Sequence, residues 1–138
     1  MIRGMTLKDQ PHIRVKAETF AAGYYPEMIP DMGKEIDLMR RCEYARVVGP
    51  EGAPTAALLA ITGNNVWATR RHATMILWYG EGHGLALLRD FKRWVAEQRL
   101  LMAGWIDDCD GDPYAATEIL QRQGFVKRGG AYVYFPKR

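Results

Sequence analysis

The sequence has few cysteines and no apolar run long enough to cross a membrane. Its only cysteines are Cys42 and Cys109. Two cysteines so far apart predict reduced thiols and not a disulfide framework. No apolar run approaches the ~20 residues of a membrane span, and the first residues lack the long apolar region of a signal peptide. We therefore expect a cytoplasmic protein with no membrane partner.

A strong excess of one charge is also missing. The formal net charge is +3, and acidic residues are mixed among the basic ones. A nucleic-acid-binding domain usually concentrates more positive charge on one element, so we expect no nucleic-acid partner. The three histidines, His12, His72 and His83, lack the spacing of metal ligands, so we expect no metal site.

What the chain does have is the composition of an ordinary globular domain. Of its 138 residues, 48% are hydrophobic and 25% are charged. This length suffices for one domain with a core but not for two. Because no repeat, low-complexity segment or linker interrupts the sequence, we expect a single domain over residues 1–138.

Apolar periodicity and turn residues predict an alternation of strands and helices. A near capping box, Thr6 with Asp9, starts the first expected helix, and Gly23 is expected to end it. The expected strands are 2–5, 44–49, 55–62, 74–79, 100–106, 126–128 and 131–135, with a short extended piece at 66–68. The expected helices are 7–22, 32–41, 85–98 and 113–123.

The clearest helix follows an apolar strand. Residues 85–98 carry one apolar stripe at helical spacing. Because the strands at 74–79 and 100–106 flank this helix, we expect a strand–helix–strand crossover or a helix packed on a sheet. The strands at 44–49 and 55–62, separated by a turn sequence, predict an antiparallel hairpin.

A glycine-rich loop joins the strand at 74–79 to this helix. Glycine occupies positions 80, 82 and 84, directly before Leu85. The N-terminus of a helix offers unpaired N–H groups and a partial positive charge, which suit a phosphate. Glycine lets the backbone turn sharply and approach such a group closely. The loop therefore predicts a phosphate site, with a plain glycine-rich turn as the alternative.

The four tryptophans lie on expected strands or on an apolar helix face. We expect Trp67, Trp78, Trp94 and Trp105 to pack in the core. For Trp78 we also consider a second role, together with Tyr79. These two residues end their strand, so they could instead line a groove beside a bound cofactor.

Three stretches of the sequence resemble the GNAT superfamily of N-acetyltransferases. They are the opening residues Ile2–Pro11, the strand, loop and helix at Ile76–Leu88, and the ending Ala116–Phe125. The resemblance implies an α/β (α+β) fold, namely one domain with a mixed, mostly antiparallel twisted sheet flanked by about four helices. It also implies transfer of an acetyl group from acetyl-CoA to an amine of a small molecule or peptide.

The resemblance also implies where a cofactor would bind. The backbone of Leu77, Trp78 and Tyr79 would pair with the pantetheine arm, and the amides of Gly82 to Leu85 would hold the pyrophosphate. The implied cofactor-binding residues are Leu77, Trp78, Tyr79, Gly80, Gly82, His83, Gly84 and Leu85. Candidates for proton transfer are Glu81 and Asp107, near strand ends, and Tyr114, in the last expected helix.

The chain departs from the family pattern at three positions. Tyr79 replaces a usual Gln or Arg, Pro113 a frequent Asn, and Leu120 a frequent acid-donating Tyr. These departures favour an alternative, a noncatalytic GNAT-like module that binds a protein partner or forms a homo-oligomer. The sequence also resembles short acetyltransferase-like proteins of tailed bacteriophages, which implies a structural or accessory role in the host cytoplasm or virion.

Overall fold

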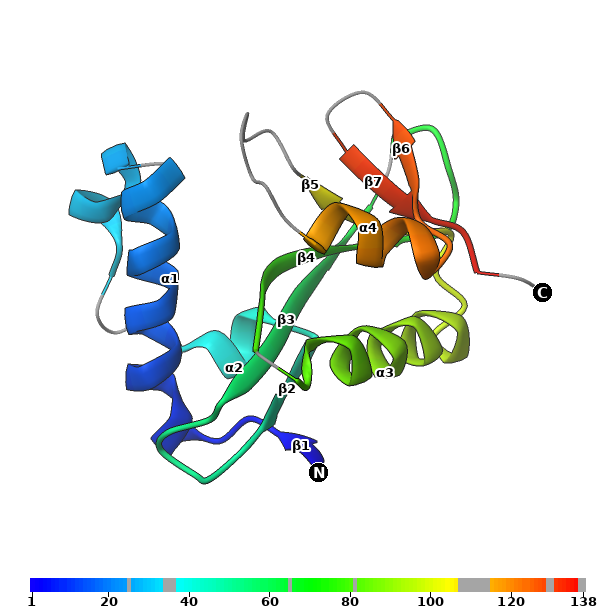
Figure 1. The fold of residues 1–138 in the computed structure, drawn as a ribbon. Coiled ribbons are helices and arrows are strands. Elements are labelled where there is room, and N and C mark those ends of the chain that lie inside the picture. The colour runs from blue at the N-terminus through cyan, green and yellow to red at the C-terminus, as the bar shows by residue number, and fades with distance from the viewer. Residues whose placement is uncertain are drawn as a thin grey trace.

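A computed structural model of the protein shows one twisted sheet with helices on both faces (Figure 1). The structure describes residues 1–24, 26–33, 37–64, 66–80, 82–106, 115–128 and 131–136. The strands are β1 (Ile2–Gly4), β2 (Tyr44–Val48), β3 (Ala56–Gly63), β4 (His72–Tyr79), β5 (Ala103–Ile106), β6 (Val126–Arg128) and β7 (Ala131–Tyr134). The helices are α1 (Gln10–Tyr24), α2 (Leu38–Arg41), α3 (Gly84–Glu97) and α4 (Ala115–Arg122), and 3-10 turns cover Leu7–Asp9 and Pro26–Asp31.

The described strands form a single sheet in the order β1-β2-β3-β4-β5-β7-β6. All neighbours pair antiparallel except β4 and β5, which are parallel. A parallel pair needs a crossover connection, and α3 supplies it. The expected mixed sheet, the hairpin of β2 with β3 and the strand–helix–strand crossover are therefore confirmed.

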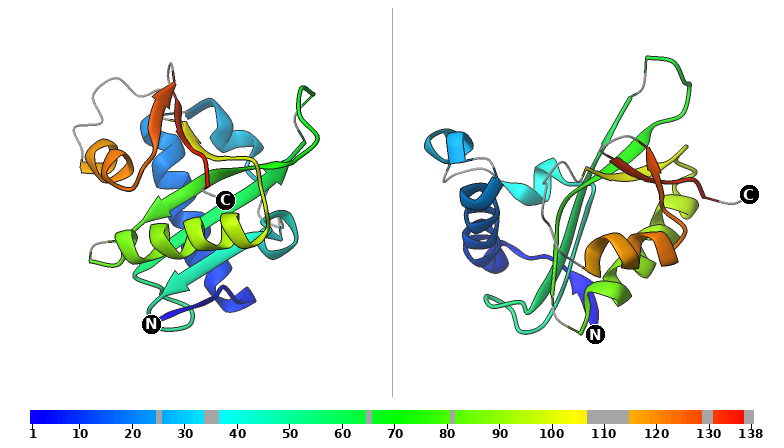
Figure 2. Two further views of the ribbon diagram at one scale, coloured as in Figure 1. Left: turned by 90° about the vertical axis from the view of Figure 1, so that its right-hand side faces the viewer. Right: turned by 45° about the horizontal axis from the view of Figure 1, so that its top comes forward.

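One face of the sheet carries the larger core, which α3 and α4 cover (Figure 2). The stripe of α3 supplies Leu87, Leu88, Phe91 and Val95, all fully buried. Tyr44 of β2 packs edge-on against the Phe91 ring at 5.1 Å. The apolar period of α3 thus predicts which side of that helix enters the core, and the described side chains agree.

The opposite face carries a smaller core under α1 and α2. Ile13 of α1 is fully buried there, with Val47 and Leu59 from the sheet and Leu77 from β4. The start of α1 is tied down by buried Asp9, which accepts hydrogen bonds from Arg3 of β1 and from the backbone N–H of Thr6. The expected pairing of Thr6 with Asp9 at the helix start is present.

A β-bulge in β4 changes which side chains face which core. Ala60 pairs with Met75, but its neighbour Leu59 pairs with Leu77, so Ile76 is the extra residue. Strict alternation would put Met75 and Leu77 on one face. Instead Met75 joins the core under α3, and Leu77 joins the core under α1.

Several expected boundaries differ from the structure. Helix α1 continues through Gly23 to Tyr24, since a glycine inside a helix costs only about 1 kcal/mol. The helix expected at 32–41 is limited to Leu38–Arg41 among the described residues, and Val66 and Trp67 form a turn instead of an extended piece. Trp67 is 93% exposed, so its expected place in the core is wrong.

No helix in the described ranges is both long and apolar enough to span a bilayer.

Candidate functional site

The loop between β4 and α3 depends on glycine at two positions, for different reasons. Gly80 has φ +132°, and an added Cβ would lie 2.1 Å from the Cβ of Ala56 on β3. Gly82 has φ +77°, but an added Cβ there would meet open space. Gly80 therefore seats the loop against the sheet, whereas Gly82 allows the turn into α3.

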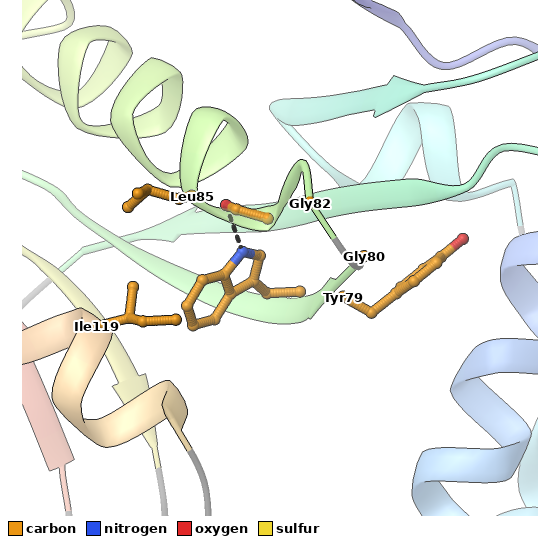
Figure 3. Close-up of a pocket in the computed structure, with 7 residues that line it drawn as sticks. Tyr79, Gly80, Gly82, Leu85 and Ile119 are labelled. Carbon is orange, nitrogen blue, oxygen red and sulfur yellow. Dashed lines mark hydrogen bonds between the residues drawn. The ribbon is translucent and has the colours of Figure 1, made fainter.

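A cavity of about 520 Å³ opens beside this loop. Figure 3 shows it between the end of β4, the first turn of α3 and α4. Its lining residues, all from these three elements and the loop, are Trp78, Tyr79, Gly80, Gly82, Gly84, Leu85 and Ile119. The indole N–H of Trp78 donates to the carbonyl of Gly84 at 2.8 Å, the dashed line in Figure 3, and so fixes the loop relative to the strand.

Strands β4 and β5 separate beside the cavity. They pair only at Ala73 with Ala103 and at Thr74 with Gly104. The rest of β5 stays paired with β7 as far as Ile106. Within the described residues, the β4 edge beyond Thr74 therefore has no strand partner on that side. Its backbone N–H and C=O groups can pair with an extended ligand.

The N-terminus of α3 faces the same cavity through Gly84 and Leu85. Its first turn contains no acidic residue, so no carboxylate of that turn competes for the helix N–H groups. The Gly84 N–H already donates to the Gly80 carbonyl at 3.0 Å. The Leu87 N–H likewise donates to the His83 carbonyl at 3.1 Å. The N–H groups of Leu85 and Ala86 have no partner within the helix itself and suit an anion.

Six of the eight cofactor-binding residues expected from the sequence line this cavity. Leu77 differs, because the bulge turns its side chain into the opposite core. His83 is the N-cap of α3 and makes no side-chain capping bond. Ile119 lines the cavity too and was not expected. Its only sequence signal is its place beside Leu120 on the apolar side of the last helix.

The structure describes none of the three residues expected to transfer protons. Glu81, Asp107 and Tyr114 lie outside the described residues, as does Pro113. Leu120 is described and is 1% exposed in the core under α3 and α4. Among the side chains described on α4, Ile119 is therefore the one that reaches the cavity, and no hydroxyl does.

No group of three or more His, Cys, Asp or Glu residues in the described part of the chain is arranged to hold a metal ion.

Comparison with known proteins relates this fold to acetyltransferases. No protein-family model and no curated protein sequence matches the chain. A GNAT family acetyltransferase from Brucella melitensis in complex with acetyl-CoA superposes with TM-score 0.70 at 14% identity, over 100% of this chain and 88% of its own. The NatC complex bound to Gag peptide and CoA gives 0.69 at 9% identity, over 99% and 98%.

An aminoglycoside 6'-N-acetyltransferase from Enterococcus faecium superposes with TM-score 0.67 at 12% identity, over 100% of this chain and 98% of its own. At such identities the likeness shows the fold alone. The chain therefore has the GNAT acetyltransferase fold, as its three sequence stretches implied.

Proposed function

We propose that this protein is an acetyl-CoA-dependent N-acetyltransferase. The observation that carries the proposal is the edge of β4 beyond Thr74, where no described strand pairs with it, beside a cavity lined by the first turn of α3. A strand edge can pair with the extended, amide-containing arm of acetyl-CoA, and a helix N-terminus can bind its phosphates. Solved structures with this fold include one in complex with acetyl-CoA.

The cavity residues fit such a cofactor. Trp78, Leu85 and Ile119 offer apolar contact, and the glycine backbone leaves room beside the helix N-terminus. The backbone of β4 after Thr74 would hold the pantetheine arm, and the amides of Leu85 and Ala86 in the first α3 turn would hold the pyrophosphate. The bound cofactor would supply an acetyl thioester. An amine would displace the CoA thiolate from its carbonyl carbon, so that an amide forms as the C–S bond breaks.

No described side chain of α4 that lines the cavity can transfer a proton, so other residues must do so. Leu120 is buried and cannot donate a proton. We assign Glu81 or Asp107 as base for the attacking amine, because both are expected near strand ends, and Tyr114 as acid for the leaving thiolate, because it is a tyrosine of the last expected helix. The acceptor is an amine of a peptide or a small molecule; the solved structures with this fold include one bound to a peptide and one named for aminoglycosides.

The test is calorimetric titration with acetyl-CoA. We expect saturable micromolar binding to the wild type and loss of binding in Gly82→Trp, since the added indole enters open space that faces the cavity. The matched control is Gly23→Trp, which adds the same side chain near the end of α1, where an added Cβ also meets open space. This control should bind like the wild type.

A second variant guards against misfolding of Gly82→Trp, whose positive φ disfavours any side chain. Ile119→Glu sits on a regular helix and puts a negative charge into the cavity. It should weaken binding of the polyanionic cofactor at least tenfold. Binding that survives both variants would place the cofactor elsewhere on the protein.

The noncatalytic alternative makes the opposite prediction. A phage-type scaffold that binds a protein partner would fold well, form a defined oligomer or complex, and leave acetyl-CoA unbound. In the catalytic case, screening peptide and small-molecule amines for release of free CoA thiol would identify the acceptor. The proposal includes the cytoplasmic location expected from the sequence.

A further inference from the structure

A second cavity, of about 570 Å³, lies on the opposite side of Tyr79 and Gly80. These two residues line both cavities and so form the wall between them. In Figure 3 the Tyr79 ring points away from Leu85 and Ile119, toward α1. The other lining residues come from α1 and the segment before β3, and they are His12, Lys16, Ala53, Pro54 and Thr55.

The polar groups of this cavity are mainly hydrogen-bond donors. Lys16 is exposed and holds its ammonium 5.4 Å from the centre of the Tyr79 ring. His12 adds a half-buried imidazole that can donate a hydrogen bond. The Thr55 hydroxyl is already committed, since it donates to the carbonyl of Val48 at 3.2 Å.

The hydroxyl of Tyr79 is buried and has no hydrogen-bond partner among the described residues. Burial raises its pKa, and nearby Asp9 raises it further, so the group keeps its proton and remains a donor. An unpaired buried hydroxyl is unfavourable, and a ligand oxygen in the cavity would satisfy it.

No acidic side chain appears among the described residues that line the cavity. The acid whose charge acts on Tyr79 is Asp9. Its carboxylate is fully engaged by Arg3, by Thr6 and by the Gly52 backbone N–H at 2.9 Å, so the charge is balanced and its oxygens are occupied. The described lining of the cavity thus offers a cation and donors without a competing carboxylate.

We propose that this cavity is a second ligand site, which binds an oxyanion, a carboxylate or phosphate group of a small molecule, through Lys16, His12 and the Tyr79 hydroxyl. An oxyanion accepts several hydrogen bonds at once, and bonds from a charged donor are the strongest. The site lies on the α1 side of the β4 end, apart from the cavity assigned to acetyl-CoA, and does not depend on acetyl transfer.

The test follows backbone amide shifts by NMR during titration with sodium phosphate and, separately, sodium acetate, each against sodium chloride at equal ionic strength. We expect saturable shifts at His12, Lys16 and Thr55 with at least one of the two anions. Which anion binds identifies the group recognised. Lys16→Gln should weaken binding about tenfold, and Tyr79→Phe should weaken it several-fold without loss of stability.

The matched control is Lys8→Gln. Lys8 is exposed near the start of α1, pairs with Glu51 and does not line the cavity. This variant removes the same charge and should leave binding unchanged. The proposal is overturned if neither anion gives saturable shifts, if the shifts are confined to residues 82–85 at the α3 N-terminus, or if Lys8→Gln weakens binding as much as Lys16→Gln.

Discussion

At the scale of single residues, Asp9 joins the start of α1 to β1 and to a turn 43 residues further along the chain. It is fully buried and accepts hydrogen bonds from Arg3 on β1, from Thr6 before α1 and from Gly52 in the turn before β3. Removing one partner of a buried ion pair leaves the other charge without compensation. Asp9 therefore anchors the start of α1 to the sheet.

Asp9→Ala should lower the free energy of unfolding by about 3–5 kcal/mol, because Arg3 and two backbone N–H groups lose their acceptor. Urea denaturation measures this change. The control is Glu51→Ala, which removes an exposed partner of Lys8 and should cost less than about 1 kcal/mol. Equal effects of the two variants would contradict the role given to Asp9.

Stability should also depend on the charge of Asp9. The hydrogen bonds from Arg3 outweigh the effect of burial and hold the pKa of Asp9 well below its usual range. A carboxyl whose pKa is lowered by folding stabilises the folded protein fully at pH values above its pKa in the unfolded chain, which is about 3.9. This stabilisation is lost as the pH falls from there toward the pKa in the folded protein. Urea unfolding from pH 6 to pH 3 should show a decline below pH ~4 that is smaller in Asp9→Asn.

Two tyrosine hydroxyls in different surroundings provide a matched comparison. The Tyr44 hydroxyl donates to buried Asp90 at 2.7 Å, and Asp90 also accepts from Arg46. Tyr44→Phe should destabilise by about 1–3 kcal/mol, since Asp90 loses a donor. Tyr79→Phe should be neutral or slightly stabilising, because its hydroxyl has no partner in the described structure. Chemical denaturation of both variants tests the contrast.

At the scale of elements, the junction of β4 and α3 determines the shape of the cavity assigned to acetyl-CoA. Gly80 lies against Ala56 of β3, and Trp78 bonds to the carbonyl of Gly84. These contacts hold the end of the strand and the start of the helix in one arrangement. The bulge at Ile76 then places Trp78 on the side of the sheet that carries α3 and α4.

Alanine at the two positive-φ glycines of this junction should have unequal effects. Gly80→Ala puts a Cβ 2.1 Å from the Cβ of Ala56, so strand β3 or β4 must shift, and we expect a loss of more than about 2 kcal/mol. Gly82→Ala has open space and should cost about 1 kcal/mol for its backbone conformation. Thermal denaturation of both variants measures the difference, and a larger cost for Gly82→Ala would contradict the packing argument.

At the scale of the whole molecule, cofactor binding should stabilise the fold. The cavity is built from β4, α3 and α4, so a ligand there contacts elements that unfolding separates. Acetyl-CoA at ~100 times its Kd should add about 3 kcal/mol and raise Tm by about 10 °C. Differential scanning calorimetry measures this shift. Gly82→Trp should show no shift, and Gly23→Trp should show the full one.

Much of the architecture was predictable because local patterns agree with the final packing. The stripe of α3 (Leu87, Leu88, Phe91 and Val95) is buried as its period predicts. The glycines after β4 mark the junction that carries the cavity. The end of α1 was not predictable, because Gly23 predicts the end of a helix but is tolerated inside this one. Trp67 reads as core but lies in an exposed turn.

The sequence by itself determined the order of elements, the apolar face of α3 and the position of the glycine loop, because each depends on neighbours within one or two turns of chain. Only the tertiary structure decided the bulge at Ile76, the separation of β5 from β4 after Gly104, and the cavity of Lys16 and Tyr79 behind the loop. These features depend on how strands that are distant in sequence pair and twist. The spacing of residues within one segment does not predict that pairing.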